Sequence, residues 1–173
     1  MSFLDTDDIW QNDKIECQIR FFEQNKNFEI VYTNYYVLNE FNKKKFIKFK
    51  NILPSGMILN DLLKDYTVGI LTVCLRRDIF RNYSFDNNLD IIGDFDLILK
   101  LSEKKNIGYI HDALATYRIH DSNLSKKKLN LHIKELEDWV KLNNDKYKNK
   151  KGLKYLKFNL FKLKLKNIFR FFK

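Results

Sequence analysis

The chain has 173 residues and a formal net charge of +10, and this charge is concentrated at its C-terminal end. Residues 146–173 hold eleven of the 32 Lys and Arg residues and no acidic residue, so the preceding part is close to neutral. This distribution disfavours a uniformly basic nucleic-acid-binding protein, and a hydrophobic content of 45% excludes wholesale disorder.

Hydrophobic periodicity and turn residues predict strands that alternate with helices. The apolar run at 2–4 is expected to be a buried strand, and residues 13–25 an amphipathic helix with Ile15, Ile19 and Phe22 on its apolar face. Further strands are expected at 28–38, 44–49, 69–75, 108–110 and 114–119, and further helices at 58–66, 94–103 and 129–142. Because strands and helices interleave, the predicted fold class is α/β.

No targeting or membrane-spanning segment is predicted. The longest apolar run, residues 68–75, is too short to span a bilayer, and the N-terminus is acidic where a signal peptide would be basic. Cys17 and Cys74 fit no metal-binding spacing. They are expected to be reduced thiols of a cytosolic protein.

The first candidate site is an acidic cluster formed by Asp5, Asp7 and Asp8 directly after the predicted strand at 2–4. Like charges at this spacing raise one another's pKa, and a divalent cation would offset the repulsion. Carboxylate oxygens are ligands that Mg²⁺ and Mn²⁺ prefer. A solvated turn with a capping aspartate is the structural alternative.

Two further candidates are single residues at the ends of predicted elements. Asp94 follows Gly93 at the start of the helix at 94–103, where an acid that only stabilises the helix dipole is the alternative. His120 closes the strand at 114–119 and opens a polar loop. A purely structural histidine is its alternative.

Together these three sites resemble one family. The segments FLDTDDIW, IIGDFDLILKL and YRIHDSNLS occur in the order of the aspartate motif, the acceptor-side helix and the late histidine segment of family-2 glycosyltransferases of the GT-A fold. The resemblance covers about residues 1–125. It implies a GT-A-like mixed sheet and transfer of a sugar, with inversion, from a nucleotide-sugar donor to a glycan or lipid-linked acceptor in bacterial surface polysaccharide or glycoconjugate synthesis.

The resemblance also implies residue roles. Asp5, Asp7 and Asp8 match the motif that contacts the nucleotide sugar and its divalent metal, Mn²⁺ or Mg²⁺, with Asp7 and Asp8 the first choices as ligands. His120 matches the residue that completes the metal or diphosphate site. Asp94 matches the base that takes a proton from the acceptor hydroxyl as this oxygen attacks the anomeric carbon. The metal would stabilise the charge on the leaving diphosphate.

The chain departs from the family in two places. Gly93 stands where a glutamate usually precedes the base, and only four residues precede Asp5, although the family has a nucleotide-binding half there. We therefore expect an N-terminally truncated GT-A domain at 1–125 that is inactive alone and poorly soluble, with its missing half encoded upstream. A degenerate, non-catalytic remnant or acceptor-binding module is the alternative.

Residues 126–173 are expected to form a helical extension with a basic amphipathic tail at 150–173. Lysines interleaved with Leu and Phe suit an interfacial helix on an anionic membrane surface. The alternatives are a helix packed on the domain and contact with nucleic acid, which the near-neutral body disfavours as a partner. The expected location is cytoplasmic and peripheral on the inner face of the cell membrane.

Overall fold

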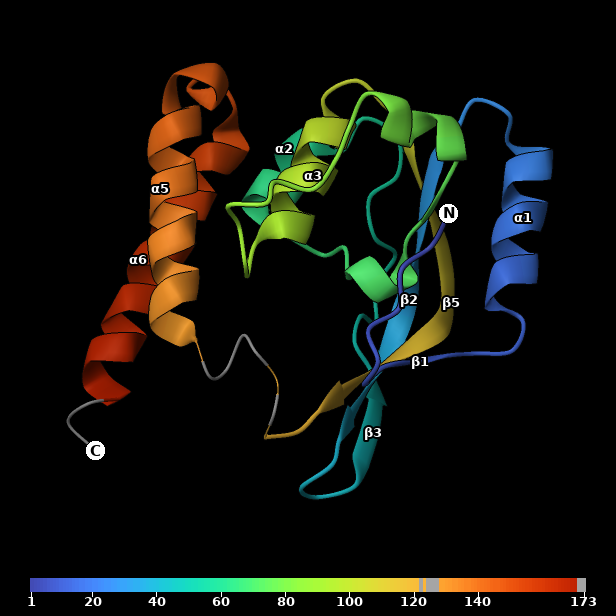
Figure 1. The fold of residues 1–173 in the computed structure, drawn as a ribbon, viewed down its shortest axis with the longest axis horizontal. Helices are drawn as coiled ribbons and strands as arrows, with labels where there is room; N and C mark the ends of the chain where they lie inside the picture. Colours follow the sequence, from blue (N-terminus) through green and yellow to red (C-terminus); the bar gives the residue numbers. More distant parts are fainter. Residues whose placement is uncertain (122, 124–127, 171–173) are drawn as a thin grey trace. The chain divides into compact units, whose positions relative to one another are not determined.

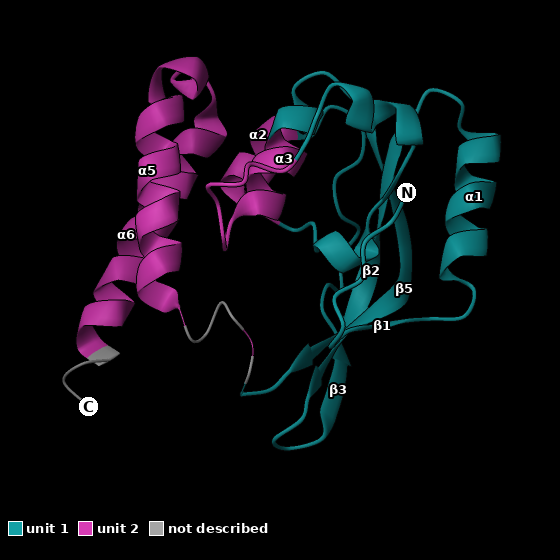
Figure 2. Ribbon diagram, in the orientation of Figure 1, with its two compact units in different colours: residues 1–58, 67–84, 100–121 teal, residues 59–66, 85–99, 122–173 magenta. Residues whose placement is uncertain are grey.

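The computed structural model describes residues 1–121, 123 and 128–170. The chain forms two compact units, coloured separately in Figure 2. Unit 1 contains Met1–Ile58, Thr67–Ser84 and Lys100–Asp121, and unit 2 contains Leu59–Tyr66, Phe85–Leu99 and the segment from residue 122 onward.

Unit 1 is built on a five-stranded mixed sheet (Figure 1). Its strands are β1 (Ile9–Trp10), β2 (Ile30–Asn39), β3 (Lys44–Ile47), β4 (Cys74–Leu75) and β5 (Ile107–Ile119). The order is β1-β5-β2-β3, and β4 also pairs with β2. β2 and β5 are parallel, whereas the other pairs are antiparallel. The predicted α/β class with a mixed sheet is confirmed.

The long parallel pair β2–β5 forms the centre of unit 1. Ile30, Val31, Tyr32 and Ile107 are fully buried at the start of this pair. The prediction of two strands at 108–110 and 114–119 was wrong, because β5 is continuous. Between the two predicted strands, His111 and Asp112 form a bulge at a register shift next to Asn34. The pairing of β5 with β2 therefore continues across these polar residues.

Helix α1 (Lys14–Gln24) lies where it was predicted, but its expected apolar face is exposed. Ile15 and Ile19 have 37% and 50% of their surface exposed, whereas Lys14 and Gln18 are completely buried. The Lys14 Nζ donates to the Gln18 Oε1 at 2.8 Å, and the Gln18 Nε2 donates to a backbone carbonyl at 2.7 Å. These hydrogen bonds satisfy the buried polar groups, which periodicity alone cannot reveal.

Two predicted strands are largely absent from unit 1. Residues 2–4 contribute one antiparallel bridge, between Ser2 and Cys74, and Leu4 is exposed. Within 69–75 the chain forms a 3₁₀ turn (Ile70–Thr72) before the short strand β4. The Thr72 hydroxyl donates to the Gly69 carbonyl at 2.6 Å, and this local bond competes with strand pairing. A second 3₁₀ helix spans Arg77–Arg81.

Unit 2 is helical. Its helices are α2 (Leu59–Lys64), the first seven residues of α3 (Gly93–Ser102), α5 (Leu129–Tyr147) and α6 (Lys151–Arg170). Rings of Phe95, Trp139 and Tyr147 pack together in its core, with centroids 4.9 and 5.7 Å apart in successive pairs.

Helix α6 packs on α2 and α5 through Leu153, Leu156 and Leu160, which are buried. Among the helices of the described residues, none combines the length and apolar character needed to cross a membrane.

Candidate functional site

The three acidic residues predicted as a cluster do lie together, on the turn that leads into β1. The backbone N–H of Asp8 donates to the Asp5 carbonyl at 3.1 Å and closes this turn. One carboxylate oxygen from each of Asp5, Asp7 and Asp8 lies within 4.8 Å of the others. Asp5 is exposed, Asp7 is half-buried and Asp8 is buried. The cluster is therefore open to a ligand on the side of Asp5.

The end of β5 holds this turn in place. The His120 Nε2 lies 2.7 Å from the Asp7 Oδ2, and the backbone N–H of Arg118 donates to the Asp8 Oδ1 at 3.0 Å. The Arg118 guanidinium donates to the Asp7 carbonyl and pairs with Glu40 at 3.2 Å. Because β1 pairs with β5, the predicted residues Asp7 and His120 meet although 113 positions separate them.

Sequence reasoning assigned no role to Arg118. Its neighbour at i+2 is His120, and side chains two apart on a strand share one face. This alternation was the signal available for placing Arg118 beside the cluster. Its positive charge next to three carboxylates moderates their mutual repulsion.

Burial raises the pKa of the Asp8 carboxyl to about 6; the Arg118 N–H opposes this shift, and the charges of Asp7 and Asp5 add to it. Burial also raises the pKa of the nearby Tyr35 hydroxyl to about 12, with Tyr117 and Asp8 contributing. Asp8 therefore ionises at a higher pH than an ordinary aspartate, and the Tyr35 hydroxyl stays neutral. A bound cation would stabilise the state in which all three carboxylates are ionised.

The donor atoms fit a hard divalent cation. Three carboxylates supply oxygen ligands, the chemistry that Mg²⁺ and Mn²⁺ share. His120 hydrogen-bonds Asp7 through Nε2, so in this geometry it orients a candidate ligand. For Nε2 to coordinate a metal directly, the contact with Asp7 has to be exchanged for the metal.

Asp94 belongs to unit 2 and lies in the first turn of α3, as predicted. Its Oδ1 accepts the backbone N–H of Phe95 at 2.8 Å, and the Tyr66 hydroxyl donates to its Oδ2 at 3.5 Å. The carboxylate is half-buried. Asp96, in contrast, is buried and accepts the indole N–H of Trp139 at 2.9 Å, which is a structural contact.

The residue that shapes the approach to Asp94 is Glu135 on α5, which sequence reasoning missed. Its buried carboxylate accepts the backbone N–H groups of Asp90, Ile91 and Ile92 at 3.0, 2.9 and 3.1 Å. Three N–H bonds from one loop fix the chain just before Gly93. A glutamate within an amphipathic helix carries no sequence signal of this role.

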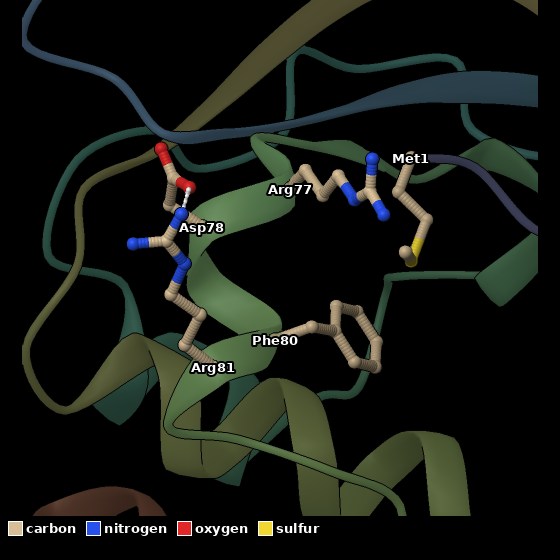
Figure 3. A pocket seen from close by; sticks show the side chains of 5 residues that line it. All are labelled: Met1, Arg77, Asp78, Phe80 and Arg81. Atoms are coloured by element: carbon tan, nitrogen blue, oxygen red, sulfur yellow. Dashed lines mark ion pairs between the residues drawn. The ribbon is translucent and has the colours of Figure 1, made fainter.

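Unit 1 also has two cavities that are lined by residues other than the acidic cluster. One, of about 400 Å³, is lined by Met1, Phe80 and the charged residues of the second 3₁₀ helix, among which Asp78 and Arg81 form an ion pair at 3.2 Å (Figure 3). The other, of about 710 Å³, lies along β2, β3 and the bulge of β5. Asp5, Asp7 and Asp8 line neither of these two cavities.

Comparison with known proteins gives several similar bacterial enzymes. Over 130 residues the chain is 33% identical to the UDP-Glc:alpha-D-GlcNAc-diphosphoundecaprenol beta-1,3-glucosyltransferase WfgD of Escherichia coli. This match covers 74% of this chain and 49% of the Escherichia coli protein. It is 28% identical over 131 residues to the putative teichuronic acid biosynthesis glycosyltransferase TuaG of Bacillus subtilis, covering 74% and 50%. An uncharacterized glycosyltransferase of Rickettsia conorii is 32% identical over 120 residues, 69% of this chain and 19% of that protein.

No family model matches the chain. The chain spans about half the length of the glucosyltransferase and of the teichuronic acid enzyme, and a smaller share of the Rickettsia protein. The matches nevertheless extend over most of this chain, and they agree in kind. Over most of its length the chain is therefore similar to bacterial glycosyltransferases, which is consistent with a family-2-like glycosyltransferase region.

Proposed function

We propose that this chain carries the metal–diphosphate part and the general base of an inverting glycosyltransferase with a GT-A-like fold. The observation that supports this most is the gathering of Asp5, Asp7 and Asp8, held by Arg118 and His120 from the end of β5. A solvated loop would not need a histidine and a strand backbone to fix its carboxylates. The similarity to bacterial glycosyltransferases supports a role for this cluster in binding the donor diphosphate through a cation.

In the proposed mechanism, Asp7 and Asp8 hold a divalent cation, and Asp5 contacts the nucleotide sugar. When bound, the cation neutralises charge on the leaving diphosphate. His120 keeps the Asp7 carboxylate oriented, and the N–H of Arg118 keeps that of Asp8 oriented. Asp94 would accept the proton of the acceptor hydroxyl as this oxygen bonds to the anomeric carbon. The bond from that carbon to the nucleoside diphosphate breaks on the opposite face, so the anomeric centre inverts.

The proposed donor is a nucleotide sugar, and the proposed acceptor is a saccharide on a lipid diphosphate. The names of two Escherichia coli relatives specify UDP-Glc and alpha-D-GlcNAc-diphosphoundecaprenol, and a Bacillus subtilis relative is named for teichuronic acid biosynthesis. We place the reaction in bacterial surface polysaccharide assembly at the cytoplasmic face of the membrane. Because the match covers only about half of each of these relatives, turnover is proposed to need further sequence.

Helix α6 is proposed to contact anionic lipid. Leu153, Leu156 and Leu160 pack inside unit 2, while other apolar side chains of α6 are 52–67% exposed, namely Phe158, Phe161, Ile168 and Phe169. Lysines alternate with these residues, and no acid occurs after Asp145. Exposed aromatic residues with interleaved lysines are typical of an interfacial helix. The packed leucines also agree with the alternative that α6 is a structural helix. The proposal therefore gives α6 two roles, packing through its buried leucines and lipid contact through its exposed side chains.

The experiment is calorimetric titration of the chain with UDP in Mn²⁺ and, separately, in EDTA. The proposal predicts UDP binding in Mn²⁺, its loss in EDTA, and its loss in Asp8→Asn but not in the exposed control Asp13→Asn. The second candidate, a non-catalytic acceptor-binding module, predicts no UDP binding in either buffer. That result would remove the donor role from the acidic cluster.

A further inference from the structure

The β2–β3 hairpin of unit 1 combines exposed apolar side chains with dense positive charge. All four residues of β3 are exposed, including Phe46 at 52% and Ile47 at 44%, and Ile52 just beyond is 81% exposed. Residues 41–52 contain five lysines, Lys43, Lys44, Lys45, Lys48 and Lys50, and no acidic residue. Figure 1 shows this hairpin extending beyond the rest of unit 1.

The position of β3 leaves both of its faces open. It is the last strand of the sheet, and Phe46 and Ile47 pair with Val37 and Tyr36, so their side chains point to opposite faces. Neither face is covered within unit 1, because both residues keep about half of their surface exposed. Exposed large apolar residues at a projecting edge are typical of an interaction surface.

The five lysines define the charge of the partner. Within the described part of the chain, none of them lies within ion-pair distance of a carboxylate. The Nζ atoms of Lys45 and Lys48 lie over the rings of Tyr36 and Phe49, at 4.3 and 5.8 Å from the centroids, so cationic and aromatic groups are adjacent on this surface. A second copy of this hairpin would be repelled, and an anionic partner would be attracted.

Lysines often protect edge strands from pairing with other chains, and this role could account for the charges. It does not account for Phe46 and Ile47, because exposed apolar side chains on an edge strand favour association with other molecules. The groove of about 710 Å³ on the sheet side of the hairpin has the same mixed character, with Tyr36, Phe46 and Phe49 beside Lys50 and a single acid, Asp112. An aromatic and cationic surface of this kind matches the headgroup zone of a membrane.

We propose that the β2–β3 hairpin docks on an anionic lipid bilayer, with Phe46 and Ile47 entering the headgroup region and the lysines contacting lipid phosphates. This surface lies in unit 1 and is distinct from helix α6 in unit 2. Vesicle binding needs no sugar donor, so the proposal succeeds or fails independently of the transferase function.

The test is co-sedimentation of the full chain with phosphatidylglycerol–phosphatidylcholine vesicles. We expect Lys44→Glu with Lys45→Glu to lower the partition coefficient about tenfold, and Phe46→Ser with Ile47→Ser to lower it several-fold, while circular dichroism remains unchanged. The control is Lys26→Glu with Lys104→Glu. These exposed lysines lie in unit 1 just before the starts of β2 and β5, at the opposite end of the parallel pair, and should leave binding unchanged.

A direct readout separates the hairpin from α6. In the Phe46→Trp variant, indole emission should shift to the blue on addition of anionic vesicles and not of neutral ones. Vesicle binding without this shift would overturn the proposal by assigning binding to another surface. Equal losses in the hairpin and control lysine pairs would also overturn it. So would loss on charge reversal with none on Phe46→Ser and Ile47→Ser, because the contact would then be purely electrostatic, with no apolar side chain entering the headgroup region.

Discussion

The most unusual single residue outside the acidic cluster is Lys14, a fully buried lysine on α1. Its ammonium group lies 4.3 Å from the centroid of the Trp10 ring and donates to Gln18. Burial lowers the pKa of Lys14 from 10.5 to about 8. Burial of the charged form therefore lowers the free energy of unfolding. This loss of stability is present in full at pH values where Lys14 is protonated in both the folded and the unfolded chain.

The consequence is a rise in stability above pH 8. Between about pH 8 and 10.5 the folded chain releases the Lys14 proton while the unfolded chain keeps it, so unfolding takes up a proton. Relative to Lys14→Met, we expect the wild-type free energy of unfolding to rise by as much as about 3 kcal/mol across this range. Urea unfolding at several pH values measures it. Parallel curves for the two proteins would show that Lys14 titrates normally.

At this scale the sequence could propose candidate site residues but not the contacts between them. Asp5, Asp7, Asp8 and His120 could be proposed as one group through the family resemblance. The contact between Asp7 and His120 could not be derived, because it depends on the pairing of β1 with β5. The burial of Lys14 beside exposed Ile15 reverses what residue type predicts, since it depends on which partners the fold supplies.

At the scale of elements, α5 positions the loop before α3 through Glu135. We expect Glu135→Gln to lower the free energy of unfolding by about 1–3 kcal/mol, because the amide can accept fewer of the three N–H bonds and its NH₂ group meets donors. Urea unfolding followed by Trp139 fluorescence measures this change. Asp138→Asn, at an exposed position of the same helix, is the control. An equal effect of both substitutions would contradict the role of Glu135.

The contact of α6 with α2 depends on Gly152. A Cβ at this position would collide with the Asn60 carbonyl and lie 2.7 Å from the Leu63 Cβ. The backbone N–H of Gly152 also donates to the Asn60 Oδ1 at 2.8 Å. Glycine is therefore required by close approach of two helices, although alanine is ordinarily the better helix former.

We expect Gly152→Ala to destabilise the chain by about 1–3 kcal/mol in thermal or urea unfolding, because α6 has to move away from α2. Gly93→Ala is the matched control, since its Cβ would meet the nearest atom, in Phe85, at an ordinary 3.7 Å. A gain in stability from Gly152→Ala would show that α6 does not pack on α2 as described.

Elements with a strong period were predicted well, and those fixed by long-range contacts were not. The strand expected at 28–38 appears close to those bounds as β2, and the helix expected at 129–142 begins where predicted and continues to Tyr147 as α5. The apolar run at 69–75 gave the strongest strand signal and forms mainly a 3₁₀ turn. Its burial was correctly indicated by composition, but the hydrogen bonds of Thr72 and of Trp10 to Leu71 determine its backbone.

At the scale of the whole molecule, charge is divided between a near-neutral N-terminal part and a basic C-terminal helix. Unit 1 carries the acidic cluster and the cationic hairpin, and unit 2 carries Asp94 and α6. We propose cation and diphosphate binding for the acidic cluster and lipid contact for the two basic surfaces. The central claim is that Asp5, Asp7 and Asp8 form a divalent-metal site.

Titration of the full chain with Mn²⁺, followed by electron paramagnetic resonance of the free ion, tests this claim most directly. We predict one saturable site whose affinity falls by more than about tenfold in Asp7→Asn and Asp8→Asn, falls about ten- to a hundredfold in His120→Gln, and is unchanged in Asp13→Asn. No saturable binding, or equal affinity in all four variants, would contradict the account.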